Sequence, residues 1–212
     1  PLSKDPIMTL TTQRWDLTWK KLGLVCPDTH LFDSVLTHYR EPHRHYHTLQ
    51  HLDECFAKWE ELRAESSHPG EVELALWFHD AIYDVKRHDN EEKSAEWARR
   101  CLLDAGASEE IAQRVHALVM ATRHHQPSVE GDASLLVDVD LSILAAPQDR
   151  FEEYERQIRA EYDYVPLALF MQERKKILQG FLNRPRIYRT KTFFELYEAT
   201  ARKNLERALE GL

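Results

Sequence analysis

Histidine is the residue type whose number and spacing first point to chemistry. The chain has 12 histidines among 212 residues, and five of them lie between positions 38 and 51. Imidazole is the commonest metal-ligating side chain, and it titrates near neutral pH. This concentration of histidine therefore predicts metal ligation or acid–base chemistry.

Two apolar segments further along the chain carry acidic partners for these histidines. His79 and Asp80 are adjacent in one apolar run, and Asp138 and Asp140 interrupt another. Charged groups in a buried segment have to be paired or bound to a metal, and a hydrogen-bonded His–Asp pair in the core is the simpler structural alternative. With one histidine from 43–51 and one of the two aspartates, the pair makes a set of two nitrogen and two oxygen ligands. Such a set suits Mn, Fe, Co, Ni, Zn or Mg.

The residues leave two positions of this ligand set open. His47 and His51 are four residues apart, so on one helix both would lie on the same face and could reach one ion. Asp138 and Asp140 are two residues apart, so on a helix they point to different sides and only one of them faces the ion.

The ordered pattern of His, then His-Asp, then Asp resembles that of the HD-domain superfamily of metal-dependent phosphohydrolases. The closer resemblance is to an uncharacterised bacterial branch identified only as predicted metal-dependent phosphohydrolases. Six blocks carry this resemblance, and they span most of the chain: 39–47, 78–84, 90–95, 138–141, 184–188 and 201–205.

The resemblance implies that His47, His79, Asp80 and Asp140 hold a divalent metal ion, with room for a second ion. His47 is preferred to His51 because the family's histidine is followed by a small polar and then an apolar residue, as in the Thr-Leu that follows His47. Asp140 is preferred because it occupies the family's usual position in its Asp-x-Asp pairing, which leaves Asp138 to support it.

Further polar residues are candidates for the reaction itself. Asp84 follows Asp80 by one expected helical turn, where it would orient a ligand or bind a second metal, or end a solvated helix. Glu91 begins the next expected helix, and the resemblance implies that it faces the site; either carboxylate would serve as general base. His125, next to His124, would hold a second metal or contact phosphate.

A phosphorylated substrate also needs a cation. Between positions 172 and 191 the chain has seven basic residues and one acidic residue, which on its own is typical of a solvated basic face. Four arginines are candidates for a clamp on an anionic substrate. They are Arg44, Arg123, Arg186 and Arg189.

The elements that position these residues are expected to be helical. Apolar residues recur at helical spacing, and the few glycines and prolines divide long segments, which predicts an all-α bundle of HD type with eight to ten helices in one domain, 1–212. Its metal-site core would cover about 39–145, with the C-terminal helices of 147–212 packed on it. For 135–144 a short strand is the alternative to a buried helix. The expected helices are about 10–22, 28–39, 46–64, 71–83, 90–106, 108–123, 135–144, 148–163, 166–182 and 192–209.

Composition excludes several other classes of function. A net charge of −8 argues against broad nucleic-acid binding, and no apolar run is long enough to span a membrane. Three widely spaced cysteines and the lack of a visible signal peptide predict a reducing, cytoplasmic location. The sequence has no P-loop, no dinucleotide fingerprint, no C-x-x-C pair and no serine-hydrolase elbow.

These observations predict a divalent-metal-dependent phosphohydrolase that uses a metal-activated water. The resemblance implies a small phosphorylated substrate of the nucleotide or phosphoester class. Two alternatives share the scaffold: a metal-holding nucleotide-binding module without turnover, and a di-iron oxygenase that takes extra ligands from Asp84, His124 and His125.

Overall fold

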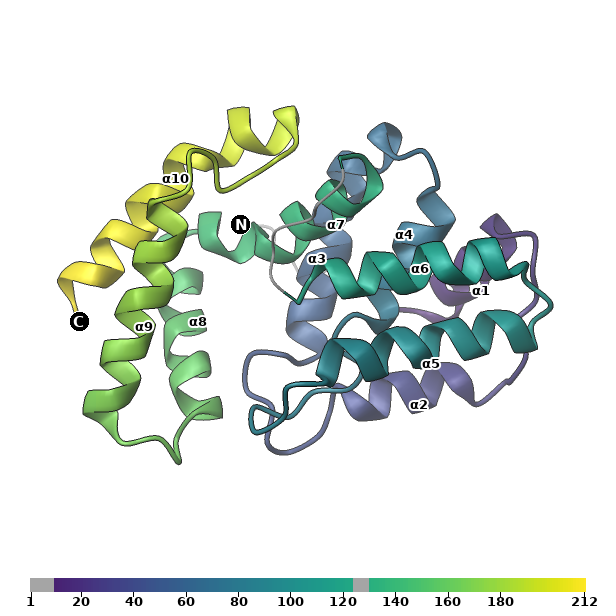
Figure 1. Cartoon of the computed structure of the whole chain (residues 1–212), viewed down its shortest axis with the longest axis horizontal. Helices are drawn as coiled ribbons and strands as arrows, with labels where there is room; N and C mark the ends of the chain where they lie inside the picture. The colour runs from purple at the N-terminus through teal and green to yellow at the C-terminus, as the bar shows by residue number, and fades with distance from the viewer. Residues whose placement is uncertain (1–9, 124–129) are drawn as a thin grey trace, which may run out of the picture.

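All regular secondary structure in the described part of the chain is helical. The computed structural model describes residues 10–123 and 130–212, and these contain ten α-helices, two short 3₁₀ helices and no strand (Figure 1). The all-α prediction and the helix over 135–144 are therefore confirmed. The helices are α1 (Thr12–Lys21), α2 (Leu31–His38), α3 (Leu49–Leu62), η1 (Arg63–Glu65), α4 (Pro69–Phe78), α5 (Asn90–Asp104), α6 (Glu109–Ala121), α7 (Asp132–Asp140), η2 (Leu141–Ala145), α8 (Gln148–Glu161), α9 (Leu167–Leu182) and α10 (Lys191–Glu210).

Capping side chains explain where several helices begin. The hydroxyls of Thr48 and Ser108 accept hydrogen bonds from backbone N–H groups in the first turns of α3 and α6, as the preference for Ser and Thr at this position predicts. Asn90 is also a residue type that favours the N-cap position, but it is the first residue of α5 rather than its cap. Its side-chain amide accepts from the backbone N–H of Asp84 and donates to the C=O of the same residue.

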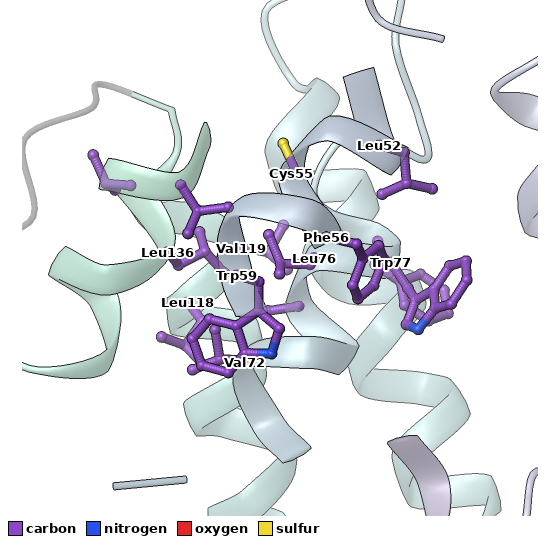
Figure 2. Packing of buried hydrophobic residues seen from close by; sticks show 14 of the residues in the cluster. Leu52, Cys55, Phe56, Trp59, Val72, Leu76, Trp77, Leu118, Val119 and Leu136 are labelled. Carbon is purple, nitrogen blue, oxygen red and sulfur yellow. The ribbon is translucent and has the colours of Figure 1, made fainter. Parts of the chain in front are cut away.

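Helix α4 lies at the centre of the larger helical group and is buried on all sides. Every residue from Gly70 to Phe78 is buried, which confirms the prediction from its apolar sequence. It contacts α1, α3, α5, α6 and α7. Figure 2 shows residues of this core: Leu52, Cys55, Phe56 and Trp59 from α3, Val72, Leu76 and Trp77 from α4, Leu118 and Val119 from α6, and Leu136 from α7.

Helix α4 is shorter than the sequence predicts. It ends at Phe78, with His79 as its C-cap, and residues 79–84 form turns rather than a continuation of the helix. Ser94 bonds both backbone groups of Ile82 and so holds these turns against α5. The His79–Asp80 pair therefore lies at a helix end, and Asp84 is not one helical turn from Asp80.

The last three helices form a second group beyond η2, on the other side of α7 from α1–α6 in Figure 1. Helix α10 packs against α9 and η2, and α8 also contacts η2. The amide of Asn204 donates to the C=O groups of Leu144 and Ala146, and the Tyr188 hydroxyl donates to the C=O of Leu141. These bonds fix the C-terminal helices next to the end of α7, where Asp140 lies.

Within the described ranges, none of the helices has both the length and the apolar character that a membrane span requires.

Candidate metal centre

Four side chains from three parts of the chain meet at one point. They are His51 in the first turn of α3, His79 and Asp80 at the end of α4, and Asp140 at the end of α7. The two Nε2 atoms are 3.1 Å apart, and each lies 3.2 to 3.6 Å from a carboxylate oxygen of Asp80 and of Asp140. Four ligands bound tetrahedrally at about 2.1 Å would lie about 3.4 Å from one another. The cluster therefore has the spacing of a ligand set for one ion.

The hydrogen bond on the far side of His79 supports this assignment. Its Nδ1 lies 2.8 Å from the C=O of Leu76. A carbonyl oxygen can only accept, so Nδ1 carries a proton and Nε2 is the ring nitrogen that would bind an ion. Metal-ligating histidines are usually oriented by such a bond.

The electrostatics of the cluster favour positive charge. Burial lowers the pKa of His79, but the charge of Asp80 and the hydrogen bonds to both aspartates raise that pKa well above its usual value. Burial raises the pKa of Asp80, but the charge of His79 and the hydrogen bonds from the two rings hold that pKa well below its usual value. A site that attracts protons so strongly also attracts a divalent cation, which would replace them.

Cys55 adjoins the same cluster. Its sulfur lies 3.7 Å from both ring nitrogens of His51, one helical turn away. One ligand atom each from His51, Cys55, His79 and Asp140 also lie within 4.8 Å of one another. Cys55 is not among the ligands predicted from the sequence, so the structure adds a thiol to the groups at this cluster.

His47 lies beside this cluster rather than in it. Thr48 is the N-cap of α3, so His47 precedes the helix. The expectation that His47 and His51 share one helical face is therefore wrong. The His47 ring stacks on Tyr83 at 4.0 Å and donates from Nδ1 to Glu161 at 2.8 Å. The geometry therefore favours His51 as the ligand and places His47 on the wall of the adjoining cavity.

Asp138 and Asp140 have separate roles, as the sequence predicts for residues two apart on a helix. Asp138 accepts hydrogen bonds from the backbone N–H groups of Arg189 and Thr190 and from the Thr190 hydroxyl. Burial raises the pKa of Asp138 to about 6, against these bonds. It anchors the segment that leads into α10, whereas Asp140 points into the cluster.

Arg44 was expected to clamp phosphate, and the structure places it elsewhere. Its buried guanidinium donates to the C=O groups of His47, Asp80 and Ala81 and to the carboxylate of Glu41. Backbone acceptors therefore engage both Nη atoms, and Arg44 is absent from the described residues that line the cavity. It ties the segment before α3 to the turns after α4 and so holds two ligand-bearing segments together.

A cavity of about 220 Å³ opens beside the cluster. Asp80 and Asp140 form one wall, and Glu91 lines it as the resemblance implies. Asp84 is not among its described lining residues, because its carboxylate turns back to the N–H of Lys86. His125, and with it His124, lies outside the described residues.

Arg174 supplies positive charge to this cavity, and sequence reasoning missed it. It is buried against Tyr154, pairs with Glu155 through Nε at 3.1 Å and through Nη2 at 2.5 Å, and lines the cavity wall. Its only signal in the sequence is its place at the start of the basic segment 172–191. Of the three other predicted arginines, Arg123 donates to the C=O of His88 and Arg186 lies over Phe194, and none of the three is among the described residues lining the cavity.

The Tyr46 hydroxyl is the second feature of this cavity that the sequence did not reveal. Tyr46 is 4% exposed and lines the cavity, and its hydroxyl has no hydrogen-bond partner among the described residues. Leaving a buried hydroxyl unpaired costs about 1–3 kcal/mol. A bound ligand with a polar atom at this position would satisfy it.

Glu161, the last residue of α8, connects the C-terminal helices to the segment before α3 and to Tyr83. Its Oε1 accepts from the backbone N–H groups of residues 45, 46 and 47, and its Oε2 accepts from His47 and from the Tyr83 hydroxyl. Burial raises the pKa of Glu161, but the charge of His47 and these hydrogen bonds lower it to about 2. No sequence signal links Glu161 to a segment 114 positions away.

Comparisons of the chain with protein-family models, with curated proteins and with solved structures each found no match. The functional interpretation therefore depends on the ligand cluster, its cavity and the sequence pattern.

Proposed function

We propose that the protein is a divalent-metal-dependent phosphohydrolase of HD type that acts on a small phosphoester or nucleotide. The observation that carries this proposal is a pair of imidazole nitrogens, 3.1 Å apart, that each lie 3.2 to 3.6 Å from a carboxylate oxygen of Asp80 and of Asp140. They lie beside a cavity that Glu91 and Arg174 also line. With an ion bound at the cluster, this arrangement would surround one small space with a cation, a base and a positively charged side chain.

The residues present fit a divalent ion. His51, His79, Asp80 and Asp140 would hold it, and a mixed imidazole and carboxylate set suits Mn, Fe, Co, Ni, Zn or Mg. Such an ion, when bound, lowers the pKa of a bound water and polarises a phosphoryl oxygen.

The other residues of the cavity have distinct tasks in this mechanism. Glu91 takes a proton from the attacking water as general base. Arg174 offsets the negative charge that develops on the phosphoryl oxygens. The unpaired Tyr46 hydroxyl donates to an oxygen of the same group.

The proposal is tested by phosphate release from a panel of nucleotides and simple phosphoesters. The protein is stripped of metal and reloaded separately with Mn²⁺, Co²⁺, Mg²⁺, Ni²⁺ or Zn²⁺, with Asp80→Ala run beside the wild type. We expect turnover that returns with metal and is lost in the variant. Glu91→Gln should lower kcat about 10²- to 10⁴-fold, whereas Glu92→Gln, at the exposed neighbouring position, should not.

Two outcomes would overturn the proposal. Folded, metal-loaded protein that binds a nucleotide but releases no product would instead support the binding module. Oxygen consumption by the iron-loaded protein, with no phosphate release, would support the di-iron oxygenase.

We also infer a reducing, cytoplasmic location from cysteine usage. Cys26, Cys55 and Cys101 are all free thiols, and two of them are buried. Proteins in oxidising compartments more often use their cysteines in disulfides.

A further inference from the structure

A second, larger cavity adjoins the one beside the ligand cluster. Its volume is about 410 Å³, against about 220 Å³ for the first. The stacked rings of His47 and Tyr83 belong to the walls of both cavities. The two cavities share five lining residues: His47, Tyr83, Ile158, Arg174 and Ile177.

This second cavity, which we call the aromatic chamber, is formed mostly by rings and aliphatic side chains from α8, α9 and the connection between them. The rings of Tyr162 and Tyr164 are nearly parallel, with an interplanar angle of 25°, and Phe170 lies 6.3 Å from Tyr162. Its apolar and aromatic lining includes Tyr83, Tyr162, Tyr164, Val165, Leu169 and Phe170.

Several of the side chains that line the chamber are partly exposed to solvent. Tyr164 is 49% exposed, Leu169 48% and Ile177 50%, although each of them lines the chamber. A ligand that covered these side chains would gain from their burial, and aromatic rings favour offset-stacked or edge-to-face partners. The chamber therefore fits a flat, apolar ring better than a hydrated sugar.

Beyond Arg174, the described residues that line the chamber include no lysine or arginine that could pair with a second anionic group. Glu173 brings a carboxylate to its wall and is held there by Lys176 at 2.7 Å. Two cationic side chains outside this lining lie over aromatic rings of the chamber. Lys86 Nζ is 4.9 Å from the ring centroid of Tyr164, and Arg159 Cζ is 4.9 Å from that of Phe170. The positive charge that faces both cavities is Arg174, on the side of the ligand cluster.

We propose that the aromatic chamber binds an uncharged aromatic ring on the alcohol part of the phosphoester, while the phosphoryl group lies at the ligand cluster. This inference rests on the proposed function for the phosphoryl end of the substrate. The small cavity alone lies below the usual size of a ligand pocket, whereas the chamber lies within that range. Substrates are therefore phosphoesters of ring-bearing alcohols, and simple alkyl phosphates are poor substrates.

A matched pair of esters tests this specificity. The esters 2-(1-naphthyl)ethyl phosphate and n-propyl phosphate are both primary alkyl phosphates, so their leaving groups are chemically similar. We expect kcat/KM to be about 10- to 100-fold higher for the naphthyl ester, since a hydrophobic pocket discriminates at this level. Equal kcat/KM values for the two esters would overturn the inference and leave the hydrolase proposal intact.

Two exposed leucines of α9 provide a matched pair of variants. Leu169 lines the chamber, whereas Leu167, 58% exposed and two residues earlier, is not among its lining residues. We expect Leu169→Ala to lower kcat/KM for the naphthyl ester about threefold or more, by the loss of apolar contact. Leu167→Ala should leave kcat/KM unchanged for both esters. Equal effects of the two variants on both esters would contradict a binding role.

A binding measurement separates this inference from the hydrolase proposal. The uncharged alcohol 2-(1-naphthyl)ethanol is titrated into metal-free protein and followed by saturation-transfer NMR. We expect saturable binding that Phe170→Ala weakens, with or without hydrolytic activity. Absence of binding to the folded wild type would overturn the inference, and a wild-type dimer that Leu169→Ala dissociates would assign the chamber to a second copy of the chain.

Discussion

The carboxylate of Glu161 accepts the Nδ1 proton of His47 at 2.8 Å, although 114 positions separate the two residues. The same carboxylate accepts three backbone N–H groups from residues 45–47. The C-terminal helices thus fix the segment that leads into α3, and through it the start of the helix that carries His51.

This relationship predicts how stability depends on pH. The pKa of Glu161 is lowered from 4.5 to about 2, because the charge of His47 and its hydrogen bonds outweigh burial. A carboxylate with a lowered pKa stabilises the folded state above its unfolded pKa, and this contribution is lost as the pH falls from about 4.5 to about 2. It amounts to on the order of 3 kcal/mol. Glu161→Gln should therefore be less stable than wild type at pH 7, and the difference should shrink towards pH 2.

Urea unfolding at a series of pH values measures this difference. Glu152→Gln is the matched control, because Glu152 is exposed on the same helix and interacts only with Gln148 in the described structure. It should follow the wild type at every pH. A difference between Glu161→Gln and wild type that stays constant down to pH 2 would show that the carboxylate charge is not responsible.

Arg44 should act on metal affinity and stability rather than on substrate binding. Its guanidinium donates to three backbone C=O groups, including that of Asp80 at 2.6 Å. A lysine ammonium is a single point donor and cannot keep this arrangement. Arg44→Lys should cost about 2–4 kcal/mol of stability and weaken metal binding about 10- to 100-fold.

Calorimetric titration of Mn²⁺ into metal-free protein measures this effect. Arg40→Lys, at an exposed position four residues earlier, should bind Mn²⁺ like the wild type. If Arg44→Lys raised KM for the phosphoester and left Mn²⁺ affinity and stability unchanged, the sequence-based interpretation of Arg44 as a phosphate clamp would be correct instead.

Metal binding should raise the thermal stability of the protein. At a free concentration of about 100 times Kd, an ion that binds only the folded state adds about 2.7 kcal/mol. For a chain of this size the gain corresponds to an increase in Tm of about 5–10 °C. Thermal scans with EDTA and then with excess Mn²⁺ measure it.

Two aspartates on α7 make this measurement specific. Asp140→Asn removes a carboxylate from the cluster and should abolish most of the Mn²⁺-induced increase in Tm. Asp138→Asn loosens the bonds to Arg189 and Thr190, so it should lower Tm and still show the increase. The opposite pattern would assign the ligand to Asp138.

The sequence predicted the helical fold and three members of the cluster, because periodicity and buried polar residues are local signals. His79, Asp80 and Asp140 stand out as polar groups in apolar segments. The choice between His47 and His51 depends on where α3 begins, and helix boundaries are the least certain part of any sequence-based assignment. Thr48, a favoured N-cap residue, was the one local sign that the helix starts after His47.

The remaining site residues depend on tertiary packing, which a single sequence does not reveal. Glu161 and Arg174 come from helices that reach the site only because α8 to α10 fold back beside η2. Arg44 lies among the histidines of residues 38–51, but two of its acceptors are the backbone C=O groups of Asp80 and Ala81. The positions of these C=O groups depend on the turns after α4. A polar side chain that binds backbone groups of a segment distant in the sequence leaves no local pattern.

Cys55 should remain outside the coordination sphere of the ion. Its sulfur is 3.7 Å from both ring nitrogens of His51, whereas a sulfur bound to an ion at Nε2 would lie nearer Nε2 than Nδ1. The Asp80 oxygen, 3.2 Å from His79 Nε2 and 3.4 Å from His51 Nε2, takes that place instead. Co²⁺-loaded protein should therefore show ligand-field bands without an intense sulfur-to-metal charge-transfer band, and Cys55→Ser should keep the same spectrum.

Cys101→Ser is the control, because burial raises the pKa of the Cys101 thiol to about 12 and its sulfur lies away from the cluster. An intense near-ultraviolet band that disappears in Cys55→Ser and persists in Cys101→Ser would place the thiolate among the ligands and shift the preferred metal towards Zn²⁺.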